Sequence, residues 1–157
     1  MNRATLVLSV DVDAPVEQTW AAAVDWAGQS AWMLGTVVEP TAQGGRGVGG
    51  GIAAFSGVRL GRLRLGVRDT MVIERWDPPR VCVVRHTGRV VRGGGTFAVE
   101  PRPGGSRFVW REDLDLPLGA VGQLGWRLLR PLFAAGVRLS LARFARWTEA
   151  GHSSSDS

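Results

Sequence analysis

Lysine and tyrosine are both absent from this chain of 157 residues, and all 19 of its basic residues are arginine. Without lysine there is no amine for a Schiff base, no anchor for pyridoxal phosphate and no phosphate-binding lysine of the P-loop type. Cys82 is the only cysteine, so the chain has no internal disulfide. With only His86 and His152 beside it, the usual ligand spacings of a metal cluster cannot be assembled. We therefore expect no metal centre.

Long apolar runs are also absent. No run approaches the roughly 20 residues that span a bilayer, and Asp11 and Asp13 interrupt the N-terminal run before a secretion signal forms. We therefore expect a cytoplasmic protein without stable membrane insertion.

The composition is that of one globular domain, with 45% hydrophobic and 21% charged residues. We expect a single domain over residues 1–149 and a disordered tail over residues 150–157, in a monomer or a homodimer. The net charge is +5, but the arginines are spread through every segment rather than gathered on one stripe with exposed aromatic residues. This distribution argues against nucleic-acid binding.

The hydrophobic pattern predicts a strand, two short helices, six more strands and one long helix. The first strand covers residues 3–13, a helix opens at Ala14-Pro15, and a second short helix covers residues 25–33. Alternation with period two then predicts strands over residues 36–40, 52–56, 62–76, 81–87, 91–100 and 106–116. Residues 118–149 show helical periodicity, and Pro131 inside them must kink or divide the helix.

This order of elements predicts an α+β helix-grip fold, in which a curved seven-stranded antiparallel sheet wraps around the long C-terminal helix. That arrangement buries the helix well and leaves room for an internal cavity. The glycine-rich segment Gly45–Gly50 matches a dinucleotide-binding loop, but a strand follows it where the phosphate site requires a helix. We therefore expect no cofactor.

Four segments carry a family resemblance: Val10–Trp20 at the first strand-to-helix junction, Trp76–Arg80 in the central hairpin, Gly105–Trp110 in the last strand, and the proline-interrupted final helix. Together they resemble the START-like, or birch-pollen-allergen-like (SRPBCC), superfamily, in its polyketide cyclase/dehydrase and lipid transport branch. The resemblance covers nearly the whole chain and implies a pocket for a hydrophobic small molecule.

Three polar residues interrupt faces that are otherwise apolar and are predicted to point inward: Asp69, His86 and Glu112. If the central hairpin pairs Trp76 with residue 79 or 80, Asp69 lies opposite residue 86 or 87. A tight turn over residues 88–91 puts His86 opposite residue 93 or 94, and a turn that pairs Glu100 with Ser106 puts Glu112 opposite Gly94. The three side chains then form one row, in which glycines leave open space between His86 and Glu112.

Two interpretations of this row remain open. In the structural one, the acid and the histidine satisfy each other, as buried polar groups normally must. In the functional one, the row orients a ligand or performs catalysis. As a catalytic site, His86 with a near-neutral pKa is the base, Asp69 fixes its tautomer, and Glu112, with a pKa raised by apolar surroundings, is the acid.

The predicted pocket walls are apolar residues on the inward faces of the sheet and the final helix. They are Trp32, Leu65, Val67, Met71, Cys82, Val84, Phe97, Phe108 and Trp110, with Leu128, Leu132, Phe133, Gly136 and Ser140 as the floor.

The leading hypothesis is that the protein binds a hydrophobic small molecule, such as a lipid, isoprenoid or polyketide, for carriage or sensing. The alternative is a polyketide cyclase or dehydratase that uses His86, Asp69 and Glu112. Aromatic polyketide cyclases of the family commonly carry an arginine and a tyrosine in the pocket. This chain has no tyrosine, and no arginine faces inward in mid-strand, which disfavours the cyclase. Peripheral membrane contact through the Arg- and Leu-rich final helix ranks third, because a helix packed on the sheet cannot also present its apolar stripe to lipid.

Overall fold

One seven-stranded antiparallel sheet, in the order β1-β7-β6-β5-β4-β3-β2, organises the computed structural model, which describes residues 2–151. The strands are β1 (Asn2–Val12), β2 (Thr36–Pro40), β3 (Gly51–Leu60), β4 (Leu63–Asp77), β5 (Val81–His86), β6 (Gly93–Arg102) and β7 (Gly105–Leu116). The helices are α1 (Val16–Ala23), the short 3₁₀ helices η1 (Ala27–Ala31) and η2 (Ala42–Gly45), and the long α2 (Gly119–Glu149). The predicted α+β helix-grip fold is confirmed.

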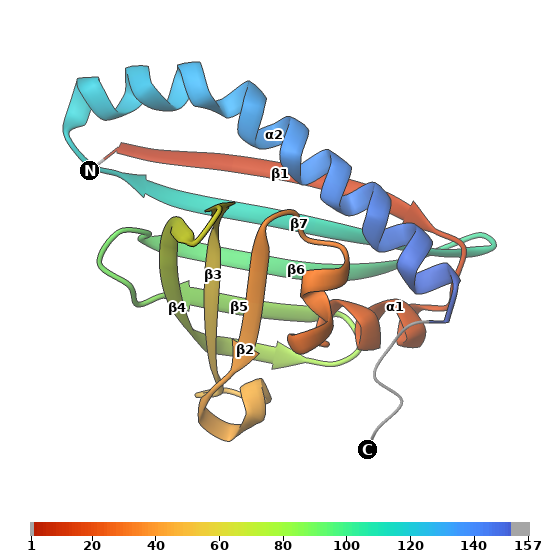
Figure 1. The fold of residues 1–157 in the computed structure, drawn as a ribbon. Coiled ribbons are helices and arrows are strands. Elements are labelled where there is room, and N and C mark those ends of the chain that lie inside the picture. Colours follow the sequence, from red (N-terminus) through yellow and green to blue (C-terminus); the bar gives the residue numbers. More distant parts are fainter. Residues whose placement is uncertain (1, 152–157) are drawn as a thin grey trace.

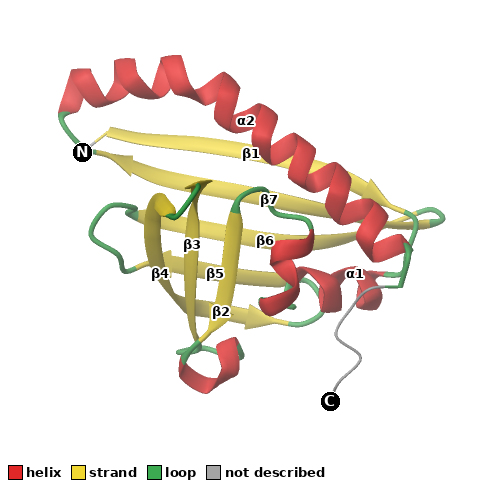
Figure 2. Cartoon of the chain, in the orientation of Figure 1, coloured by secondary structure: helices red, strands yellow, loops and turns green. Residues whose placement is uncertain are grey.

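The sheet curves strongly around its contents. In Figure 1, β2 and β3 run nearly across the direction of β1 and β7, while α2 lies along β1 and α1 closes one end. The distribution of helices on one side of the sheet is also visible in Figure 2. This curvature creates the interior in which the candidate site lies.

An aromatic cluster fills one part of that interior, under the second half of α2. Trp32, Phe108 and Phe144 are fully buried, and the Phe144 ring centroid lies 4.9 Å from that of Trp32 and 4.5 Å from that of Phe108. Such edge-to-face and tilted pairs stabilise a core beyond the area that they bury. The cluster anchors α2 to β7 and to the segment after η1.

The final helix is continuous through Pro131 and bends along its length (Figure 1). Proline removes a backbone donor and crowds the preceding turn, which accounts for a bend. Every buried residue of α2 lies after Pro131, beginning with Ala134. The sheet therefore grips only the second half of the helix.

The predicted tail over residues 150–157 is described only in part. Ala150 and Gly151 end α2, with their backbone N–H groups donating to the carbonyls of Arg146 and Thr148. Residues 152–157 lie outside the described part of the chain. None of the described helices has the length and apolar character needed to cross a membrane.

Candidate functional site

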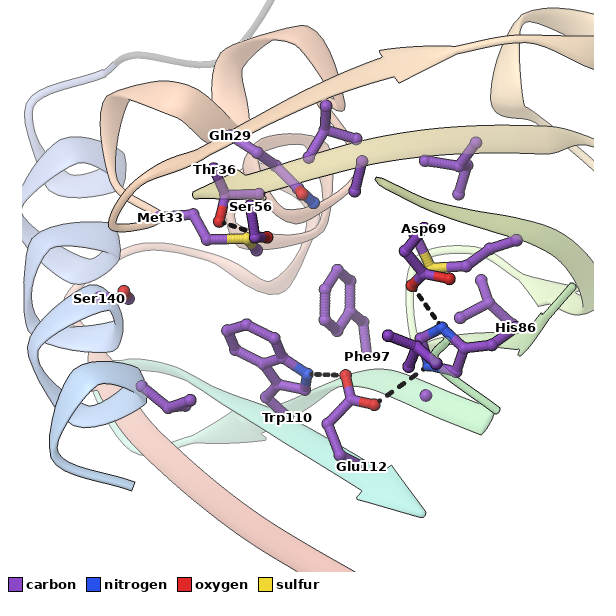
Figure 3. Close-up of a pocket in the computed structure, with 18 of the residues that line it drawn as sticks. Gln29, Met33, Thr36, Ser56, Asp69, His86, Phe97, Trp110, Glu112 and Ser140 are labelled. Atoms are coloured by element: carbon purple, nitrogen blue, oxygen red, sulfur yellow. Dashed lines mark hydrogen bonds and ion pairs between the residues drawn. The ribbon is translucent and has the colours of Figure 1, made fainter. Parts of the chain in front are cut away.

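A cavity of about 400 Å³ lies between the concave face of the sheet, η1 and the second half of α2. Its lining is mostly apolar and includes Met71, Val84, Phe97 and Trp110 from the sheet (Figure 3). A volume of this size is within the range of small-molecule sites in proteins.

The three predicted polar residues meet at one end of this cavity (Figure 3). His86 Nδ1 lies 2.6 Å from Asp69 Oδ2, and His86 Nε2 lies 3.3 Å from Glu112 Oε2. The indole N–H of Trp110 donates to Glu112 Oε1 over 2.6 Å. The side chain of His86 is only 6% exposed and the two carboxylates 14%. We call Asp69, His86 and Glu112 the polar row.

The strand register differs from the predicted one and still brings the row together. His86 pairs with Met71, two residues beyond Asp69, because the hairpin pairs Asp77 with Val81 rather than Trp76 with residue 79 or 80; the register shift between Ile73 and Arg75 then reduces this offset by one residue. Since side chains on a strand alternate with period two, a displacement of two residues keeps Asp69 on the same face as His86. The two side chains meet diagonally rather than directly across the ladder.

Glycines of β6 give Glu112 access to His86. His86 pairs with Gly93, as predicted, whereas Glu112 pairs with Gly95 instead of Gly94. The shift of one residue arises because the β6–β7 turn is tight, with Arg102 opposite Gly105. A Cβ atom on Gly95 would lie 3.2 Å from Glu112 Oε1, so a side chain there would compete with the carboxylate for this space.

Two opposing effects set the charge of His86. Burial, the largest single effect, lowers the pKa because it disfavours the charged form. The hydrogen bonds and charges of Asp69 and Glu112 together outweigh burial and raise the pKa of His86 from 6.5 to about 9. At neutral pH the ring is an imidazolium that donates one hydrogen bond to each carboxylate. It therefore has no lone pair with which to act as the base that the sequence analysis envisaged.

One acceptor of the row has no partner among the described residues. Asp69 Oδ1 is buried and receives no hydrogen bond, whereas the other three carboxylate oxygens of the row are engaged. Buried acceptors are normally satisfied, so an unpaired one on a cavity-lining residue marks a place for a donor. Oδ1 lies toward Gly88, where a Cβ atom would be 3.3 Å away, so a donor in the cavity reaches it only if the carboxylate rotates.

Eight of the fourteen predicted wall residues line the cavity: Met71, Cys82, Val84, Phe97, Trp110, Phe133, Gly136 and Ser140. Trp32 and Phe108 instead belong to the buried aromatic cluster. Leu65 and Val67 lie on the cavity-facing side of β4 but beyond the cavity, where no helix covers the strand. Leu128 and Leu132 are exposed on the ungripped first half of α2. These six positions correct the predicted wall, because periodicity gives the face of an element but not how far along it the cavity extends.

Thr36 and Ser56 form a second polar group across the cavity, which the sequence did not predict. Thr36 Oγ1 lies 2.9 Å from Ser56 Oγ (Figure 3). The predicted wall residue Ser140 also lies in the cavity wall, and its Oγ accepts a hydrogen bond from the Leu34 N–H. Both hydroxyls of the first pair lie on neighbouring strands, β2 and β3, where they face each other. Only the pairing of these strands, which the sequence did not give, would have revealed them.

No set of three or more His, Cys, Asp or Glu side chains within residues 2–151 is arranged to hold a metal ion. The single thiol also lines the cavity, but burial raises the pKa of Cys82 to about 12. A neutral thiol is a poor nucleophile and a poor metal ligand. Cys82 therefore contributes apolar surface.

Solved structures of similar fold come from several bacteria. The protein TTHA0849 of Thermus thermophilus is 21% identical, with a TM-score of 0.77 over 96% of this chain and all of that one. The Zhui aromatase/cyclase of Streptomyces sp. R1128 is 16% identical, with a TM-score of 0.71 over 94% of each chain. No curated protein sequence matches the chain.

A family model described as polyketide cyclase/dehydrase and lipid transport matches residues 3–149. The match spans the sheet, the cavity and the final helix. The chain belongs to the polyketide cyclase/dehydrase and lipid transport family.

Proposed function

We propose that the cavity binds a neutral hydrophobic molecule that carries a hydroxyl group, and that the protein carries or senses this molecule. The observation that carries the proposal is the unpaired Asp69 Oδ1 of a negatively charged row, at one end of a mostly apolar cavity. The apolar walls would bind the carbon skeleton, and the row would orient the hydroxyl.

The charge of the polar row selects the ligand's functional group. Two carboxylates and one imidazolium give the row one net negative charge at neutral pH. Both N–H groups of His86 already donate to the carboxylates, so the row offers acceptors and no free donor. A ligand hydroxyl would donate to a carboxylate of the row, whereas a ligand carboxylate or phosphate would be repelled. The ligand class is therefore closer to an isoprenoid alcohol or a phenolic polyketide than to a fatty acid anion.

A matched pair of probes tests the hydroxyl, and a matched pair of variants tests the cavity. The probes are 2-naphthol and naphthalene, which share one skeleton and differ in the hydroxyl. Gly136 lines the cavity and Gly125 does not, and a Cβ atom meets nothing within 4 Å at either position. Leucine at either site thus leaves the fold intact and raises helix propensity by a similar amount, but only Gly136→Leu places a side chain in the cavity.

We expect 2-naphthol to bind the wild-type protein roughly tenfold more tightly than naphthalene, as a hydrogen bond to a charged group implies. Calorimetric titration measures both affinities. Gly136→Leu is expected to lose both probes and Gly125→Leu to keep them. Equal affinities for 2-naphthol and naphthalene would refute recognition of the hydroxyl group. Unchanged binding of both probes to Gly136→Leu would refute the cavity as their binding site.

Acid–base catalysis is a second candidate, favoured by a buried imidazolium between two carboxylates. In a dehydration, Asp69 would take the proton from the α carbon, a C=C bond would form as the C–O bond breaks, and His86 would transfer the proton that it shares with Glu112 to the leaving hydroxyl, which departs as water. The roles of His86 differ from those expected from the sequence, because the protonated ring is an acid.

Replacing His86 and Glu112 together with Gln separates binding from catalysis. If the row only orients the ligand, affinity for 2-naphthol changes by less than about tenfold, because the cavity walls still hold the skeleton. If the row catalyses dehydration, turnover of a β-hydroxy ketone substrate is lost in the double variant. Turnover that survives in the double variant would dismiss the catalytic candidate.

A further inference from the structure

The first half of α2 exposes an apolar surface that no other part of the described chain covers. No residue between Gly119 and Phe133 is buried. The exposed residues are Leu118, Val121, Leu124, Leu128, Leu129 and Leu132, each 59–79% exposed. A surface of this kind is uncommon on a monomer and marks a contact site.

The tip of the β3–β4 hairpin presents a second apolar surface. Leu60 pairs with Leu63 and Val58 with Leu65 across the hairpin, so these four side chains share one face. Each is 49–62% exposed. Asp69 lies on this same face of β4 and lines the cavity. Because side chains alternate along a strand, the hairpin face continues the cavity-lining face of β4 toward the hairpin tip.

The two surfaces adjoin residues that line the cavity, namely Asp69 on β4 and Phe133 on α2. Figure 1 shows the β3–β4 hairpin tip and the beginning of α2 at the same end of the molecule. Phe133, which lines the cavity and is 41% exposed, joins the first half of α2 to the cavity wall. We call residues 58–67 and 118–133 the docking surface.

The charges of the docking surface are all positive. Residues 57–68 contain four arginines and no acidic residue, and residues 117–148 also lack any acid. Arg59 lies directly opposite Arg64 in the hairpin, and like charges in such a pair destabilise it. No ion pair between described residues includes an arginine of the docking surface. These cations lack a counter-charge within the described chain.

We propose that the docking surface binds an anionic lipid bilayer. On the hairpin, Arg59 and Arg64 lie on the face opposite to the leucines. An amphipathic surface of this kind fits the interface of such a bilayer, where apolar side chains enter the acyl boundary and arginines meet lipid phosphates. A second copy of the chain fits less well, since a two-fold contact through the leucines would gather the arginines of both copies without any acid. The sequence analysis expected that a helix packed on the sheet cannot also contact lipid. The second half of α2 packs on the sheet, which leaves the first half free for the bilayer.

Docking would bring the cavity wall at Phe133 close to the bilayer. A hydrophobic ligand then passes between membrane and cavity without crossing water. This consequence rests on the proposed function, whereas docking itself does not and is measurable with the empty protein.

Vesicle sedimentation tests docking, with phosphatidylcholine vesicles that contain 30% phosphatidylglycerol in one arm and none in the other. We expect binding only to the anionic vesicles and its loss at high salt. Arg62→Gln/Arg64→Gln is expected to weaken the partition coefficient about 30-fold, at about fivefold for each arginine. Leu60→Ser/Leu63→Ser is expected to weaken it roughly tenfold or more, because burial of apolar side chains is lost. Arg46→Gln/Val48→Ser, which changes an exposed arginine and valine near η2 at another end of the molecule, is the matched control and is expected to bind as the wild type does.

Urea unfolding of each variant checks that the fold is kept, and sedimentation equilibrium without lipid reports the oligomeric state. Equal binding to both kinds of vesicle, no binding to either, or equal weakening by the control variant would overturn the proposal. The proposal would also fail if the wild type were a dimer that does not bind vesicles and Leu60→Ser/Leu63→Ser were a monomer. The docking surface would then be the contact between two copies of the chain. Vesicle binding that persists when the naphthol experiment fails would leave docking standing and refute only the proposed function.

Discussion

Raising the pH from 6 to 9 is expected to remove roughly 3 kcal/mol of folding free energy, because His86 loses the proton that it shares with two carboxylates. The pKa of His86 is about 9 in the folded protein and 6.5 for the free side chain. A folded-state pKa above the unfolded one means that the folded state holds the proton more tightly. The stabilisation is therefore fully present below pH 6.5 and is lost as the pH rises to about 9. The interval of about 2.5 pH units corresponds to roughly 3 kcal/mol at about 1.36 kcal/mol per unit.

Urea unfolding between pH 6 and pH 9 measures this loss, with His86→Gln as the reference. The chain suits the experiment because it has no lysine and no tyrosine, so few other groups titrate in this range. Subtracting the profile of His86→Gln removes what those groups contribute. If the wild type and His86→Gln lose stability in parallel, or if the wild type gains stability as the pH rises, the charged polar row is refuted.

Three further predictions concern single residues. Glu112→Gln is expected to lower the pKa of His86 below about 9, because one hydrogen bond and one negative charge are lost; an NMR titration of the imidazole that gives the wild-type value would contradict this. Phe144→Ala is expected to cost about 3–5 kcal/mol of unfolding free energy in urea, since the ring is fully buried against Trp32 and Phe108; a loss under 1 kcal/mol would be inconsistent with that packing. Cys82, which is 1% exposed, is expected to react with a disulfide reagent at pH 8 only as fast as the protein unfolds; immediate reaction of the native protein would count against its burial.

Sequence periodicity was sufficient for the fold because each element satisfies one simple rule. Alternation over residues 62–76 and 106–116 marks strands with one inward face, and the spacing after Pro117 marks a helix with an apolar stripe. The structure has these elements with bounds that differ by a few residues. The second short helix, predicted over residues 25–33, is the 3₁₀ helix Ala27–Ala31.

The polar row was predictable for the same reason, although its register was not. The period of two placed Asp69, His86 and Glu112 on one face. The hairpin offset and the register shift in β4 together displace Asp69 by two residues, which preserved that face. The register shift between Ile73 and Arg75 leaves no clear mark in the sequence, because it depends on how β4 curves within the sheet. The protonation of His86 was also beyond reach, since it depends on two carboxylates from different strands at hydrogen-bond distance.

The extent of the cavity could not be read from periodicity. Leu128 and Leu132 lie on the same broad stripe as residues that pack on the sheet, and a stripe that faces the sheet has the same spacing as one that faces solvent or lipid. Trp32 and Phe108 posed the reverse problem, because large aromatic residues suit both a cavity wall and a solid core. The path of α2 decides both questions. Before Pro131 the helix leaves its leucines exposed, and after Pro131 it packs Phe144 against Trp32 and Phe108.

Native mass spectrometry of the wild-type protein and of Gly136→Leu, each expressed in the source organism, tests the claim that the interior is a ligand site most directly. We predict a copurifying neutral molecule that bears a hydroxyl group, present on the wild type, absent from Gly136→Leu and released on unfolding. A molecule of the same mass on both proteins would contradict the account, as would a wild-type protein that carries only a carboxylate- or phosphate-bearing compound.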